Sequence, residues 1–154
     1  MQSGPSFAAN PDVVDEYVFE RGERVASIFK LVDACHRCGL AFRVASDQIA
    51  NAVFRHYADE LRQMMDRFSF ELLTEIRRID GGDFGPARSY VEPVENPDAL
   101  QGRCNAALRD VEETYEEILR DHLPAHARAM IKRQSQQFSQ MISRFTDLGR
   151  ELSA

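Results

Sequence analysis

Residues 81–96 read GGDFGPARSYVEPVEN, and they interrupt a chain that is otherwise patterned for long helices. The segment holds three Gly and two Pro, and its apolar residues have no helical spacing. Gly81 and Gly82 give the backbone left-handed freedom and lower its helix propensity. We therefore expect one long connection here, with helices on both sides.

Two helices are expected on the N-terminal side of this linker. Ser46-Asp47 offers an N-cap for a helix that stops at Gly81, and the preceding helix is expected to end near Ala45 after an interruption at Gly22. Apolar residues recur at spacings of three and four in both segments, which indicates one buried face each. The two stripes are Val25, Ile28, Val32, Cys35, Gly39 and Phe42, and then Ala50, Val53, Tyr57, Leu61, Met64, Phe68, Leu72, Ile76 and Ile79.

Two more helices are expected after the linker. Asn96-Pro97-Asp98 combines a cap, a Pro suited to the first turn and an acid suited to the helix dipole, and that helix should end near Asp121. Pro124 opens the last helix. Their stripes are Leu100, Cys104, Leu108, Val111, Tyr115 and Ile118, and then Ile131, Gln134, Phe138, Met141, Phe145, Leu148 and Leu152.

The length of the linker predicts the topology. A helix of about 30 residues is roughly 45 Å long, and about 16 extended residues reach roughly 50 Å. The linker can therefore cross the whole bundle, which leaves the helices beside it parallel. We expect an all-α, ferritin-like up-down four-helix bundle over residues 22–149, with a disordered segment at 1–10, a helical extension at 11–21 and a tail at 150–154.

Composition and charge exclude several classes of function. The net charge of -6 argues against non-specific binding to nucleic acid, because that binding depends on Lys and Arg neutralising phosphates. Neither a membrane-spanning run nor a secretion signal is present in the sequence. Three cysteines form an odd set that is expected to be reduced. We expect a cytoplasmic protein that binds neither nucleic acid nor membrane.

Three of the expected helices carry short motifs, within a span of residues 25–148, that together suggest a known family. They are Cys35 with Phe42, Phe68 with Glu71-Leu72, Glu75-Ile76-Arg77-Arg78 before Gly81-Gly82, and Cys104 with Tyr115-Glu116-Glu117, Leu119 and Leu123-Pro124. In these residues the chain resembles a bacterial ferritin-like four-helix-bundle family of unknown function. The chain departs from the family at Gly39, Leu108 and Arg109, where the resemblance implies carboxylates.

A di-iron site is not expected in this bundle. Such a site uses a Glu from each of two helices and Glu-x-x-His from each of the other two. Glu-x-x-His does not occur in the sequence, and no Asp or Glu lies between Pro124 and Asp147. We predict no cofactor. The weak metal candidates are Glu112 and Glu116, which share a helix face, and His122 and His126; we expect these four as surface groups, with the acids paired to Arg128, Lys132 or Arg133.

Gln134 is the informative polar residue of the expected core. It lies in register with Ile131 and Phe138, and a buried amide needs hydrogen-bond partners. Tyr57 and Tyr115 are the candidates, and the amide is either a register device or the remnant of a ligand position. Cys35 and Cys104 are expected as small core residues rather than reactive thiols.

Two functions of different classes remain open. The first is a non-catalytic bundle that acts through association, as a homo-oligomer such as a dimer or with another protein. This hypothesis rests on the apolar residues at 13–19, which add apolar surface beyond what four core helices need. The alternative is a metal-dependent di-iron or manganese oxidase or iron-handling protein, by fold analogy. A ligand pocket lined by Met64, Met65, Met130 and Met141 is a third possibility.

Overall fold

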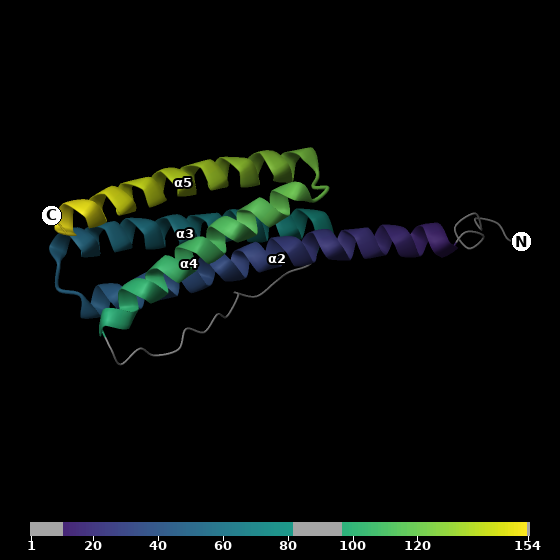
Figure 1. Ribbon diagram of the computed structural model, residues 1–154. Coiled ribbons are helices and arrows are strands. Elements are labelled where there is room, and N and C mark those ends of the chain that lie inside the picture. Colours follow the sequence, from purple (N-terminus) through teal and green to yellow (C-terminus); the bar gives the residue numbers. More distant parts are fainter. Residues whose placement is uncertain (1–10, 82–96, 154) are drawn as a thin grey trace, which may run out of the picture.

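The protein is built from four helices, seen in a computed structural model that describes residues 11–81 and 97–153. They are α2 (Pro11–Gln48), α3 (Ala52–Asp80), α4 (Pro97–Arg120) and α5 (Ala125–Ser153) (Figure 1). The described residues contain no strand, so the all-α, four-helix prediction is confirmed. Within the same ranges, no helix combines the length and the apolar character that crossing a membrane requires.

Helix α2 is one continuous helix of 38 residues, so the predicted interruption at Gly22 is wrong. A single Gly costs only about 1 kcal/mol relative to Ala, and without a cap or a Pro it does not end a helix. Residues 11–21 are therefore the first turns of α2 and not a separate element. Likewise, residues 150–153, predicted as a tail, belong to α5.

The turn between α2 and α3 also differs from the prediction. Ser46 and Asp47 lie in the last turn of α2, and the cap of α3 is Asn51, whose side chain accepts a hydrogen bond from the amide of Phe54 at 3.0 Å. Arg55 closes the turn, because its Nε donates to the carbonyl oxygens of Ser46 and Ile49. Asn51 is the cap because a capping residue needs an extended backbone just before the first helical turn, and Asn51 has that conformation.

The end of α3 agrees with the prediction. Gly81 adopts a φ of 71°, in the left-handed region, and its amide donates to the carbonyl of Arg77. A residue without a Cβ takes this conformation without steric cost. The helix therefore stops where the linker begins.

The helices form two antiparallel hairpins that pack together. Helix α2 packs against α3 and α4, and α5 packs against α4 and, more loosely, against α3. Helices α3 and α4 run in the same direction in Figure 1, while α2 and α5 run in the opposite one. Residues 82–96 lie outside the described residues, so the predicted crossover stays a prediction.

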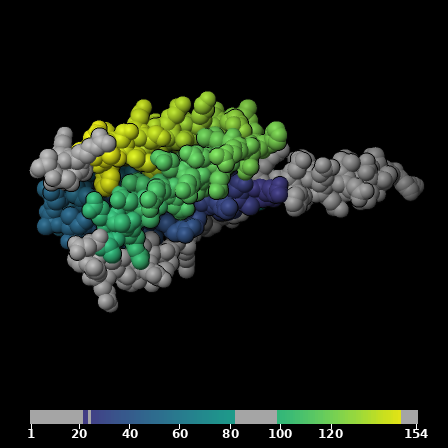
Figure 2. All heavy atoms as spheres, viewed as in Figure 1, coloured from purple at the N-terminus to yellow at the C-terminus, as the bar shows by residue number. Residues whose placement is uncertain are grey.

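The core is formed by the inward stripes of all four helices. Its largest fully buried side chains include Phe42, Phe68, Tyr115 and Phe138, one from each helix. The predicted stripe of α3 needs two corrections at its start, because Ala50 is exposed and lies before the helix, and Val53 is 52% exposed. In the space-filling view of Figure 2, α4 and α5 lie against each other along the face turned to the viewer.

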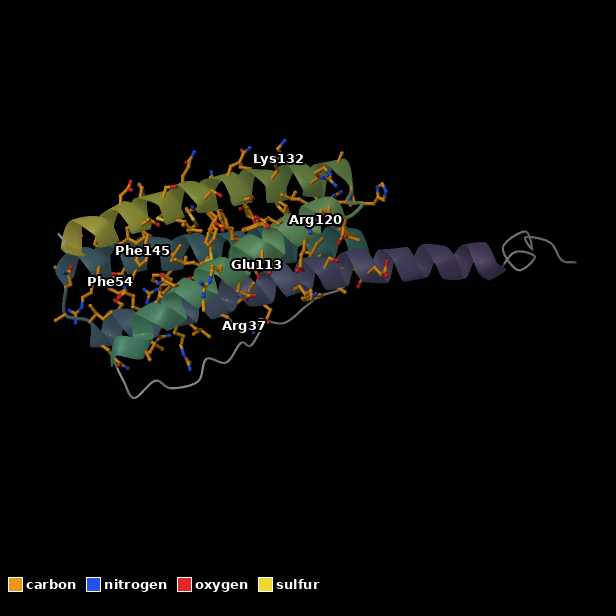
Figure 3. All side chains as sticks on the ribbon, in the orientation of Figure 1. Arg37, Phe54, Glu113, Arg120, Lys132 and Phe145 are labelled. Carbon is orange, nitrogen blue, oxygen red and sulfur yellow. The ribbon has the colours of Figure 1, made fainter. Side chains whose placement is uncertain are left out.

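An aromatic cluster closes the end of the bundle near the α2–α3 turn. The ring of Phe145 lies 5.6 Å from Phe42, 6.2 Å from Phe54 and 5.1 Å from Tyr57. Figure 3 shows Phe54 and Phe145 at this end, with Phe54 on α3 and Phe145 on α5. These contacts join α2, α3 and α5.

Candidate functional site

A buried polar network crosses the middle of the bundle at Gln134. The amide is fully buried on α5. Its Oε1 accepts a hydrogen bond from the hydroxyl of Tyr115 on α4 at 3.0 Å, and its Nε2 donates to Oε1 of Glu71 on α3 at 3.2 Å. Nε2 also lies 3.4 Å from the carbonyl of Phe68. One side chain therefore connects three helices and has its polar atoms satisfied.

Tyr57 takes no part in this network. It lies in the aromatic cluster, and its buried hydroxyl has no hydrogen-bond partner of normal geometry among the described residues. Burial raises the pKa of Tyr57 to about 12, although the nearby Arg144 acts in the opposite direction. Of the two partners considered for Gln134, the structure places Tyr115 beside it.

The three cysteines are buried free thiols. Burial raises the pKa of Cys35 to about 12, although a hydrogen bond with Tyr115 lowers it, and burial raises the pKa of Cys104 to about 12. Burial, with smaller effects of Cys35, Cys104 and Asp110, also holds the pKa of Cys38 well above its usual value. Because the thiolate is the nucleophile and the metal ligand, these side chains are suited to packing and not to chemistry.

The four metal candidates do not form a site. Glu112 is half-buried and Glu116 exposed on α4, and His122 is exposed in the α4–α5 turn. His126 lies against Glu75 of α3 instead. Within residues 11–81 and 97–153, no group of three His, Cys, Asp or Glu side chains is arranged to hold a metal ion. The predicted pairing of the α4 acids with Arg128 and Arg133 is also wrong. Arg128 donates to the backbone carbonyls of Leu119 and Asp121, and Arg133 pairs with Glu71.

Glu75 is the buried charge that the sequence analysis missed. Only 3% of it is exposed, and its carboxylate accepts hydrogen bonds from Arg78 and lies 3.0 Å from Nδ1 of His126. Burial alone would raise the pKa of Glu75, but Arg78 and His126 together outweigh it and the pKa is lowered. The sequence does contain a pattern that indicates this buried charge. Glu75 lies between Leu72 and Ile76 of the α3 stripe, and Arg78 follows one turn later as a partner.

Ion pairs run along the line where α3 faces α5, which we call the α3–α5 seam. Glu60 pairs with Arg144 at 3.2 Å, Glu71 with Arg133, and Glu75 with His126. The step from Glu60 to Glu71 on α3 is matched by the step from Arg144 to Arg133 on α5, as expected for antiparallel helices in register. The seam is therefore polar, in contrast to the apolar contacts inside the bundle.

A hollow of about 540 Å³ opens in this seam. Its wall includes Met64 and Met141, together with Arg67, Arg144 and the amide of Gln137. Oε1 of Gln137 is buried and has no hydrogen-bond partner within the described residues. Of the four methionines considered for a ligand pocket, Met64 and Met141 line this hollow, whereas Met65 is buried in the core and Met130 packs at its edge.

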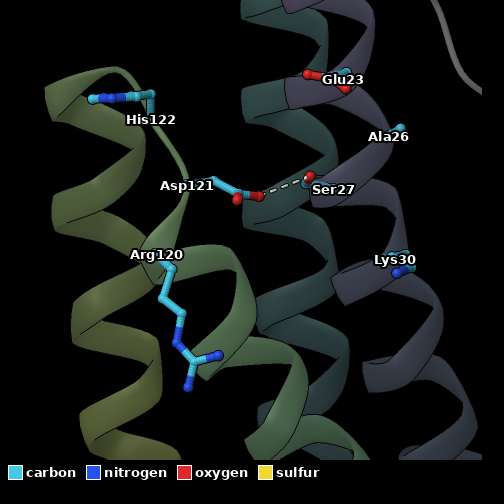
Figure 4. Close-up of a pocket in the computed structure, with 7 residues that line it drawn as sticks. All are labelled: Glu23, Ala26, Ser27, Lys30, Arg120, Asp121 and His122. Carbon is cyan, nitrogen blue, oxygen red and sulfur yellow. Dashed lines mark hydrogen bonds between the residues drawn. The ribbon is translucent and has the colours of Figure 1, made fainter.

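A second hollow, of about 710 Å³, lies between α2 and the α4–α5 turn. Ser27 donates to the carboxylate of Asp121 across it at 3.2 Å (Figure 4). The side chains of Arg120 and His122 point away from this bond and from Lys30 in the same view. The charged groups therefore do not converge on one point, as a binding site for a small ion would require.

Comparisons with known proteins leave the resemblance to the ferritin-like family as an expectation. No family model, curated protein or solved structure matches the chain. The function is therefore argued from the geometry alone.

Proposed function

We propose that this chain is a non-catalytic, ferritin-like four-helix bundle that acts through association and forms a homodimer. The shared direction of α3 and α4 in Figure 1 supports the ferritin-like topology, because a long crossover leaves its two helices parallel. The satisfied amide of Gln134 and the protonated core thiols support a structural rather than a catalytic core.

The observation that carries the proposal is the projection of α2. At its N-terminal end the helix continues past the ends of the other three, and Figure 1 shows no other helix beside it there. Residues 13–19 of this part read VVDEYVF. On a helix, positions 14, 17 and 18 share one face, so the sequence places Val14, Tyr17 and Val18 on one apolar stripe of this projecting part. Such surface commonly meets another protein.

Helix energetics favour a partner for this segment. A stretch of about 11 residues is too short to be a stable helix in water by itself, and most helical stability in proteins comes from packing an apolar face. A second copy is always available to a self-associating chain, and a twofold pair would cover both projections with one type of contact. No observation within the described residues favours the oxidase alternative.

Sedimentation equilibrium of three chains tests the proposal. The intact chain and a chain lacking residues 1–9 are expected to sediment as dimers, and a chain lacking residues 1–20 as a monomer with an unchanged bundle by circular dichroism. The 1–9 deletion is the matched control, because it removes chain but keeps the projecting helix. A monomeric intact chain, or a dimer that survives the 1–20 deletion, would contradict the proposal.

A further inference from the structure

The hollow in the α3–α5 seam lies between two ion pairs. Glu60 pairs with Arg144 on one side of it, and Glu71 pairs with Arg133 on the other. These long side chains span the seam at two levels where the helices pack only loosely. Between them the seam is open over about 540 Å³, within the range of roughly 300–1,000 Å³ that ligand sites commonly have. The ion pairs therefore bridge the seam without filling it.

Arg67 and Gln137 face each other across this hollow. The pair of Glu60 and Arg144 sets the register of the two antiparallel helices. Arg67 follows Glu60 by seven residues on α3. Gln137 precedes Arg144 by the same number of residues on α5. Both side chains line the hollow, so one level of its wall is polar.

Met64 and Met141 form the neighbouring level of the wall. Met64 lies one turn before Arg67 on α3, and Met141 lies one turn after the glutamine on α5, so both are displaced toward the same end of the seam. Met141 is buried and Met64 partly buried. Methionine side chains are flexible and adapt to apolar groups of different shapes. Since the α5 lining runs from Gln137 to Arg144, over roughly 10 Å, the hollow is elongated along the seam.

The hollow carries one positive charge that no described residue balances. Its wall has two arginines and no Asp or Glu among the described residues. Arg144 is paired with Glu60 and lies 3.6 Å from the sulfur of Met141. Arg67 is exposed, packs over the ring of Phe68 and makes no ion pair with a described residue. The wall therefore favours a single anionic group and disfavours a metal cation.

Gln137 adds an acceptor that lacks a donor. Its Oε1 is buried and has no hydrogen-bond partner within the parts of the chain that the structure describes. Buried polar atoms nearly always have a partner, and an amide oxygen can only accept. Gln134, one turn earlier on the same helix, has both its oxygen and its nitrogen bonded. A molecule bound in the hollow would complete Gln137 by donating a hydrogen bond from a hydroxyl group.

We propose that the hollow binds an unbranched acyl carboxylate of medium length that carries a hydroxyl group close to its carboxylate. Arg67 binds the carboxylate, and Oε1 of Gln137 accepts the hydrogen bond of the hydroxyl. The acyl chain lies along Met64 and Met141. This site goes beyond the proposed association and does not depend on it, because α3 and α5 of one chain form it.

Three probes that differ by one group separate these contributions. They are 3-hydroxydecanoate, decanoate, which lacks the hydroxyl, and 1,3-decanediol, which lacks the carboxylate. Isothermal titration calorimetry of the full chain, with each probe below its micellar concentration, measures the dissociation constants. Relative to 3-hydroxydecanoate, decanoate is expected to bind about fivefold more weakly and the diol about tenfold, since a hydrogen bond to a charged group contributes more than a neutral one.

Two substitutions in the wall assign these contributions to residues. Gln137→Leu is expected to abolish the preference for 3-hydroxydecanoate over decanoate, a ratio that a general loss of stability does not change. Arg67→Gln is expected to weaken the binding of both carboxylates about tenfold and to leave that of the diol unchanged. Arg43→Gln is the matched control, because it removes the same charge from an exposed position on α2. Its dissociation constants are expected to equal those of the wild type.

The probe series on the wild type tests the proposal without any substitution. No binding, or equal affinities for the three probes, would overturn it. A preference for the hydroxyl that survives Gln137→Leu would also do so. The same holds if Arg67→Gln leaves carboxylate binding unchanged, because the acyl chain would then adsorb elsewhere on the surface.

Discussion

The hydroxyl of Tyr115 on α4 donates a hydrogen bond to Oε1 of Gln134 on α5, at 3.0 Å and with both side chains almost fully buried. This bond and the one from Gln134 to Glu71 fix the register of α5 against two other helices. Removing one partner of a buried hydrogen bond lowers stability, because the polar group of the other partner is then left unsatisfied.

Gln134→Leu is therefore expected to lower the free energy of unfolding by about 1–3 kcal/mol. Combining it with Tyr115→Phe is expected to cost less than the sum of the two single changes, since the double variant leaves no orphaned hydroxyl. Urea denaturation of the wild type and the three variants measures the coupling. Strict additivity would show that the two side chains do not act together.

Glu75 makes the stability of the protein depend on acid pH. Its folded-state pKa lies below the ordinary value of 4.5, so the stability that it contributes is present above that value. It is lost as the pH falls through the folded-state pKa. Glu75→Gln is expected to be less stable at pH 7 and to lose less stability between pH 5 and 3 than the wild type. Equal acid sensitivity in thermal melts of the two chains would contradict the assignment.

The buried thiols are expected to be inert in the folded protein. Burial raises the pKa of Cys35 and of Cys104 to about 12, so the reactive thiolate is scarce at pH 8. A thiol-specific reagent should label none of the three cysteines in native buffer and all of them in denaturant. Rapid stoichiometric labelling of the native chain would show that the core opens or that a thiol is exposed.

Phe145 and Phe70 form a matched pair for testing the aromatic cluster. Phe145 contacts rings from α2 and α3, whereas Phe70 is 70% exposed on α3. Phe145→Ala is expected to lower the free energy of unfolding by about 2–4 kcal/mol, and Phe70→Ala by less than about 0.5 kcal/mol. Similar losses in chemical denaturation would contradict the cluster as a stabilising element.

The sequence allowed the helices and most of the core to be predicted, because apolar spacing reports directly which face is buried. Leu61, Phe68, Leu72 and Ile76 lie inward as the period requires, and Gly81 ends α3. The capping residue Asn51 was missed because Ser46-Asp47 carries the same chemical signal. Only the backbone conformation distinguishes the two.

The polar contacts depended on information that a single helix does not contain. Glu75 was not anticipated as a buried group, since its burial is stabilised partly by His126 from another helix. The seam pairs, such as Glu71 with Arg133, depend on the relative register of α3 and α5. Local periodicity does not determine that register.

The mass of the intact chain in solution tests the central claim most directly. Light scattering coupled to size-exclusion chromatography, over a range of protein concentrations, measures it without any substitution. One chain has a mass of 17.6 kDa, and association through the projecting part of α2 predicts a particle of twice that mass. A particle of 17.6 kDa at every concentration would contradict the claim.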